Sequence, residues 1–141
     1  PNLTDGDWLW GGSPEQIKVS IAKGRNGVMP NLGLTPEQVD NLTAHVMSLS
    51  GRDADAAKAE AGKEAFMTAG CIGCHGMDGT GNQMLGAPNL TDNTWLYGGS
   101  PGAIKQTLIK GRAGVMPAQK ELLGDEKVHL LTAYVYSLSN K

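Results

Sequence analysis

The sequence predicts an all-α fold, and three observations support this prediction. Helix-start signals recur along the chain, the apolar residues that follow them have helical spacing, and strand signals are nearly absent. The length of 141 residues allows one domain or two very small ones. We therefore expect helices joined by glycine-rich loops, and no β-sheet is required.

Serine-proline and threonine-proline pairs mark most of the expected helix starts, because the hydroxyl caps the helix and proline suits its first position. Three groups of helices are expected. Ser13-Pro14 and Ser100-Pro101 each open a helix of about ten residues that ends at a glycine, Gly24 or Gly111. Thr35-Pro36 opens a longer helix, and its counterpart opens near Asp125. An alanine-rich helix is expected from Ala56 to Gly70.

A tandem repeat organises the chain. Residues 1–30 recur 87 positions later as residues 88–117, with shared Pro-Asn-Leu-Thr-Asp, Gly-Gly-Ser-Pro and Gly-Val-Met-Pro. Only the second copy has a segment corresponding to residues 56–87. We therefore expect residues 1–50 to be the C-terminal half of a first domain, residues 51–55 to be a polar linker, and residues 56–141 to be a complete second domain.

The segment Cys71-Ile72-Gly73-Cys74-His75 is typical of a c-type haem attachment site. In such a site each cysteine sulfur adds to one haem vinyl group, and the adjacent imidazole binds the iron from one face. A redox dithiol or half of a zinc site are the alternatives. The other histidines, His45 and His129, are isolated in helical patterns, and no βαβ alternation surrounds the motif. We therefore expect one covalently bound haem c in this chain, with His75 as an iron ligand.

The second axial ligand decides between electron transfer and small-molecule chemistry. Met116 follows the motif by about forty residues and lies in Gly-Val-Met-Pro between two expected helices. A loop with proline after methionine can hold a thioether rigidly, so Met116 is the expected second ligand. Its repeat partner Met29 is then the equivalent ligand of a first haem whose attachment motif is absent. His45 is interpreted as an ordinary helix residue.

Three further residues are expected near the haem. Trp95, Tyr97 and Arg112 can hydrogen-bond or ion-pair with haem propionates, or they can serve as packing and capping residues of the Gly-Gly turn.

The motif, the string Gly-Ala-Pro-Asn-Leu at 86–90 and Met116-Pro117 resemble the class I cytochrome c fold over residues 56–141. In that family the carbonyl of the proline matching Pro88 accepts a hydrogen bond from the iron-binding histidine. The first and last helices of the family cross, and the resemblance implies that Gly62 and Phe66 meet Leu131 and Tyr134.

The twice-repeated string Pro-Asn-Leu-Thr-Asp-x-x-Trp-Leu-x-Gly-Gly-Ser resembles the dihaem subunits of cbb3-type cytochrome c oxidases. That resemblance implies an electron-transfer role and a parent protein with two haems. It also implies as partners other oxidase subunits and a donor cytochrome c, and a location on the periplasmic side of the bacterial inner membrane. Membrane attachment would then depend on an anchor absent from these residues.

Composition excludes some functions and leaves others open. A net charge of −2 gives no basic surface for nucleic acid, and no apolar run approaches the roughly 20 residues of a membrane span. A soluble periplasmic dihaem carrier remains an alternative, as does a haem peroxidase or gas sensor with a labile sixth ligand. The half-domain at 1–50 is expected to result from truncation of a longer chain or to pair with another chain by domain swapping.

Overall fold

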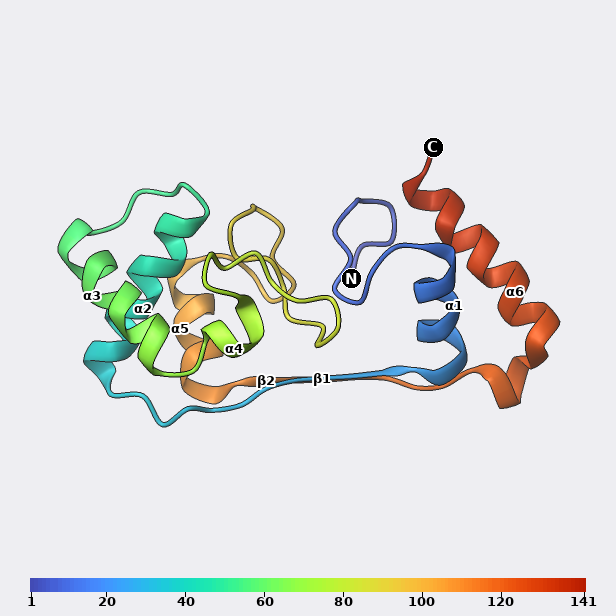
Figure 1. Cartoon of the computed structure of the whole chain (residues 1–141), viewed down its shortest axis with the longest axis horizontal. Helices are drawn as coiled ribbons and strands as arrows, with labels where there is room; N and C mark the ends of the chain where they lie inside the picture. The colour runs from blue at the N-terminus through green and yellow to red at the C-terminus, as the bar shows by residue number, and fades with distance from the viewer.

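The computed structural model describes all residues, 1–141, and has two lobes joined by a thin ribbon (Figure 1). In chain order the elements are α1 (Pro14–Lys23), β1 (Arg25–Met29), α2 (Pro36–Leu49), α3 (Ala56–Thr68), α4 (Ile72–His75), α5 (Pro101–Lys110), β2 (Arg112–Met116) and α6 (Lys120–Ser139). The larger lobe contains α2 to α5, and the smaller lobe contains α1 and α6. The ribbon between them consists of β1 and β2. The fold is thus mostly helical.

The helix starts lie where the sequence predicts them. Ser13, Thr35 and Ser100 each accept a hydrogen bond from the backbone N–H three residues later, as N-caps do. In the first two cases a glutamine side chain returns a bond to the cap and completes a capping box. α6 has a break at Gly124, whose φ is 78°, so its long segment begins at Asp125 as expected.

The prediction that no β-sheet is present is wrong. β1 and β2 form an antiparallel pair in which Arg25 lies opposite Met116 and Met29 lies opposite Arg112. The two strands are repeat copies of each other, and they pair because both cross from one lobe to the other along the same path (Figure 1). Neither strand has a partner nearby in the sequence, which is why local pattern gives no signal for it.

The two C-terminal helices of the repeats are exchanged between the lobes. α2, from the first copy, packs on α3 and α5 of the second copy, whereas α6 packs on α1 of the first. The short segment 50–55 between α2 and α3 favours this neighbour, since closing a short loop costs little chain entropy. The lobes therefore cut across the boundaries expected from the repeat, and the number of domains stays a prediction.

The expected crossing of Gly62 and Phe66 with Leu131 and Tyr134 is wrong in this structure. α3 instead meets the repeat equivalents in α2. The backbone at Gly62 touches that of Asn41, so closely that a Cβ would collide with its carbonyl oxygen. The ring of Phe66 packs edge to face against His45, with 5.3 Å between centroids.

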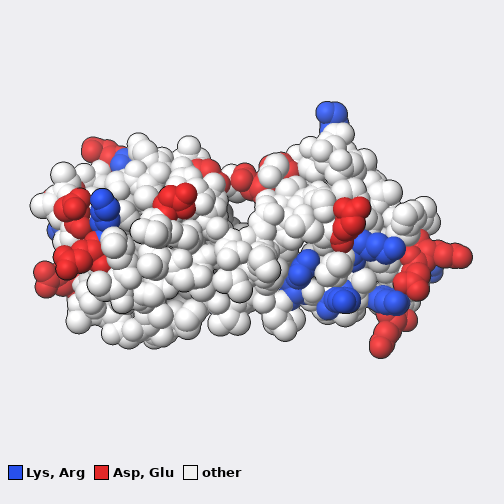
Figure 2. All heavy atoms as spheres, viewed as in Figure 1, with Lys and Arg blue, Asp and Glu red and all other residues white.

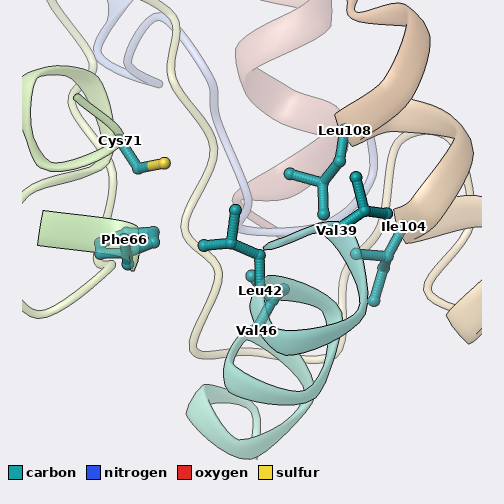
Figure 3. Packing of buried hydrophobic residues seen from close by; sticks show 7 residues of the cluster. All are labelled: Val39, Leu42, Val46, Phe66, Cys71, Ile104 and Leu108. Carbon is teal, nitrogen blue, oxygen red and sulfur yellow. The ribbon is translucent and has the colours of Figure 1, made fainter. Parts of the chain in front are cut away.

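Each lobe has its own small core. The larger core consists of buried residues from α2, α3, α5 and the segment before α4: Val39, Leu42, Val46, Phe66, Cys71, Ile104 and Leu108 (Figure 3). The smaller core joins Ile17 and Ile21 of α1 to Val128 of α6. These three residues are the repeat equivalents of Ile104, Leu108 and Val39, so the same helix pairing is made twice.

Charged side chains gather toward the two ends of the molecule, and the middle of the face seen in Figure 2 carries few of them. None of the helices combines the length and apolar character needed to cross a lipid bilayer.

Candidate haem site

The cysteine-histidine motif forms a single helical turn at the edge of the larger lobe. His75 N–H donates to the Cys71 carbonyl at 2.9 Å, which places residues 71, 74 and 75 on one side of the turn. Cys71 is buried and Cys74 is exposed, and both are free thiols. Burial raises the pKa of the Cys71 thiol. No group of three or more histidine, cysteine or acidic side chains is arranged to hold a metal ion.

The orientation of His75 is fixed by Pro88. The His75 Nδ1 atom lies 3.0 Å from the Pro88 carbonyl oxygen. A carbonyl can only accept, so Nδ1 carries the hydrogen and Nε2 keeps a free lone pair. Burial lowers the pKa of His75, and the bond to Pro88 opposes that shift in part. The ring is therefore held neutral, in the tautomer that can bind a metal through Nε2.

The glycine-rich loop after the motif holds Pro88 in place. Gly81 N–H donates to the His75 carbonyl at 2.8 Å, and Leu90 N–H donates to Gly79 at 2.7 Å. Gly81 has a φ of +87°, and a Cβ there would lie 2.7 Å from the Pro88 carbonyl carbon. Glycine is required at this position both by its conformation and by the close approach of the two strands of the loop.

Apolar side chains face the motif from the other elements of the lobe. Figure 3 shows the sulfur of Cys71 pointing from its turn toward residues of α2 and α5, with Phe66 of α3 beside it. Leu42 is fully buried in this core, and Leu108 is 6% exposed. The resemblance to class I cytochromes c implies that α6, not α2, packs against α3.

The aromatic candidates pair with arginines. The guanidinium of Arg112 lies over the ring of Tyr97, 4.5 Å from its centroid, and donates to Thr107 at 3.0 Å. Trp95 packs on the core, and the guanidinium carbon of Arg52 lies over its ring, 4.9 Å from the centroid. Arg52 is a residue that the sequence places only in a linker. Its Nη2 atom is buried and has no hydrogen-bond partner.

The two methionines of the Gly-Val-Met-Pro segments lie in different lobes. Met29 is partly buried and packs against the core that contains Cys71. Met116 is 43% exposed, at the other end of the ribbon, and its carbonyl lies against Gly24 at the end of α1. The structure therefore does not bring Met116 to the motif. Sequence alone could not distinguish the two, because their local contexts are the same.

The residues present fit a covalently bound haem. Two free thiols and an oriented imidazole share one turn, an apolar wall faces them, and a buried guanidinium nitrogen without a partner is available for an anionic group. These are the chemical groups that attach the vinyl groups, bind the iron and neutralise a propionate.

Comparison with known proteins identifies relatives of this chain. The family profile described as "Cytochrome C oxidase, cbb3-type, subunit III" matches residues 57–135, more than half of the chain. The chain is 45% identical to the cbb3-type cytochrome c oxidase subunit CcoP of Rubrivivax gelatinosus, over 99% of its own length and 46% of the relative. It is 43% identical to subunit FixP of Sinorhizobium medicae, over 98% of its length and 51% of the relative. The chain spans about half the length of the curated relatives it matches.

Proposed function

Because the chain belongs to the family of cbb3-type cytochrome c oxidase subunit III, we propose that it transfers electrons by means of a covalently bound haem c. It acts as a non-catalytic subunit that delivers electrons to a respiratory oxidase. The observation that carries the proposal is the His75–Pro88 hydrogen bond beside two free thiols on one helical turn.

Each site residue has a distinct role in this proposal. The thiols of Cys71 and Cys74 would hold the haem, each by adding across one vinyl double bond. In each addition the S–H bond and the vinyl π bond would break, an S–C and a C–H bond would form, and no electrons would be lost. His75 Nε2 and a methionine thioether from a Gly-Val-Met-Pro segment would hold the iron. Arg52, Arg112, Tyr97 and Trp95 would hold the propionates.

The protein environment suits one-electron transfer. Haem c supplies a one-electron couple when bound. Pro88 holds the imidazole in one orientation, and the buried side chains of Leu42, Phe66 and Leu108 would keep water from a bound iron. A thioether ligand favours ferrous iron, and a dry site disfavours the extra charge of ferric iron, so both raise the potential.

The relatives named above support the association with oxidase subunits, and the resemblance to dihaem oxidase subunits supports the donor and the location. We propose that the chain associates with other subunits of a cbb3-type oxidase and receives electrons from a donor cytochrome c, on the periplasmic side of the inner membrane. One haem per chain is proposed for residues 1–141.

The proposal is tested by haem analysis of the chain produced with a cytochrome c maturation system. One haem per chain is expected to stay bound after denaturation, and Cys71→Ala/Cys74→Ala is expected to lose it. Cys74→Ala alone leaves a single thioether bond, to Cys71, and is intermediate between the unchanged chain and the double variant. The spectrum is expected to be low-spin in both oxidation states. A high-spin spectrum with ready binding of carbon monoxide to ferrous iron would contradict electron transfer and favour the gas-sensor or peroxidase alternative.

A further inference from the structure

We propose that the thioether ligand opposite His75 comes from the other repeat: it is Met29, and not Met116. The inference rests on the proposed haem attachment at residues 71–75, and it reassigns the second iron ligand within that site. The haem site is then assembled from both repeats.

The packing of the two methionines carries this inference. Met29 contacts the core that includes Cys71, Phe66 and Leu108. The following backbone, from Met29 to Asn31, lies against Gly111 at the end of α5, so closely that a Cβ on Gly111 would collide with the Met29 carbonyl oxygen. Gly111 has a φ of +70°, and its repeat equivalent Gly24, with a φ of +71°, makes the same close contact with the Met116 carbonyl oxygen in the other lobe.

The ribbon prevents Met116 from sharing this place. In the antiparallel register, Met29 and Met116 lie at opposite ends of a five-residue ladder. Four steps of about 3.4 Å separate their Cα atoms by about 14 Å along the strands. After β2 the chain is anchored to the other lobe, where Gln119 N–H donates to the Ile21 carbonyl at 3.0 Å. Only one of the two thioethers can therefore bind an iron held by His75.

The exchange makes the same pairing of repeated helices in both lobes, α5 with α2 and α1 with α6. α5 receives Val39 of α2 where it would otherwise receive Val128 of α6, and α1 receives Val128 in return. A surface ion pair is specific to the exchanged arrangement: Lys105 Nζ of α5 lies 2.6 Å from Asp40 Oδ1 of α2. Without the exchange Asp40 would face Lys18, the repeat equivalent of Lys105, and Lys105 would face His129.

The first test replaces each methionine in the haem-loaded chain. Met29→Ala is expected to abolish the weak red absorption band of thioether-bound ferric haem and to lower the reduction potential, whereas Met116→Ala is expected to keep both. The opposite pattern, or a band that survives both substitutions, would overturn the assignment. A wild-type chain without the band would overturn thioether ligation altogether, while covalent haem attachment would stand.

The second test detects the exchange of α2 and α6 by chemical cross-linking, without relying on the haem spectrum. Treatment of the monomeric, haem-loaded chain with a carbodiimide, followed by peptide mass mapping, is expected to join Asp40 to Lys105. Lys105→Arg keeps the positive charge but removes the reactive amine, so it should abolish this cross-link, and Lys18→Arg should not. A cross-link between Asp40 and Lys18 would show that each repeat keeps its own helix and would overturn the proposal.

Discussion

His45 illustrates how the two copies of the repeat differ at a single residue. It lies in α2, where it is 8% exposed and packs against Phe66, whereas its equivalent Tyr134 in α6 is 61% exposed. Burial is the main cause that lowers the pKa of His45, Lys63 adds to the lowering, and Glu60 opposes it. The ring is therefore neutral in the folded chain at neutral pH.

This pKa shift predicts a loss of stability in acid. In the unfolded chain His45 gains a proton as the pH falls through its ordinary pKa of about 6.5, while in the folded chain it does so only at lower pH. Between these two values the unfolded chain binds more protons, so the free energy of unfolding falls as the pH falls. His45→Leu is expected to flatten this part of the curve in denaturant titrations at a series of pH values. Parallel curves for the two proteins would contradict the prediction.

Sequence predicts some site residues well and cannot predict others. Cys71, Cys74 and His75 form a local motif, and the resemblance to class I cytochromes c predicts the Pro88 bond that the structure contains. The choice between Met29 and Met116 depends on which lobe each strand reaches, and that is decided by packing far along the chain. Arg52 was missed for the same reason, since its contact with Trp95 spans two repeats.

At the scale of elements, α2 and α6 have similar sequences but different surroundings. α2 is buried on two sides, between α3 and α5, whereas α6 packs mainly on α1. Leu42 is accordingly fully buried, and its equivalent Leu131 is 39% exposed. Val39 and Val128, which face α5 and α1, are buried in both copies.

These helices provide a matched pair of substitutions. Leu42→Ala is expected to lower the free energy of unfolding by about 2–5 kcal/mol, because it leaves a cavity in a packed core. Leu131→Ala removes a partly exposed side chain and is expected to cost about 1 kcal/mol or less. Denaturant unfolding of the haem-loaded chain measures both. A larger loss for Leu131→Ala would mean that α6, not α2, covers α3.

Helix positions were predictable because capping signals are local, and the ribbon was not. Ser13, Thr35 and Ser100 act within three residues of themselves. β1 and β2 are five residues each, contain a central glycine and pair only with each other across 87 positions of sequence. The resemblance to single cytochrome c domains also pairs α3 with the last helix of its own domain, α6. The repeat supplies a second helix with similar apolar positions, α2.

At the scale of the whole molecule, the chain forms two lobes, and the C-terminal helices of the two repeats, α2 and α6, are exchanged between them (Figure 1). The lobes also touch through their loops: Thr94 donates to Asp7 at 2.7 Å, and the Gln83 amide donates to the Trp8 carbonyl at 3.2 Å. These contacts and the ribbon join the lobe that contains the proposed haem site to a lobe that has only α1 and α6. The proposed electron transfer would therefore depend on one lobe, and that lobe includes a helix from the other repeat.

Nuclear magnetic resonance of the haem-loaded chain identifies directly which terminal helix lies beside the iron. Low-spin ferric iron shifts nearby amide resonances, and the shift falls steeply with distance, so the ferrous chain serves as the unshifted reference. Amides of α2, from Val39 to Val46, are expected to shift strongly between the two oxidation states, and those of α6, from Val128 to Val135, only weakly. Strong shifts in α6 with weak shifts in α2 would contradict a haem site built from both repeats.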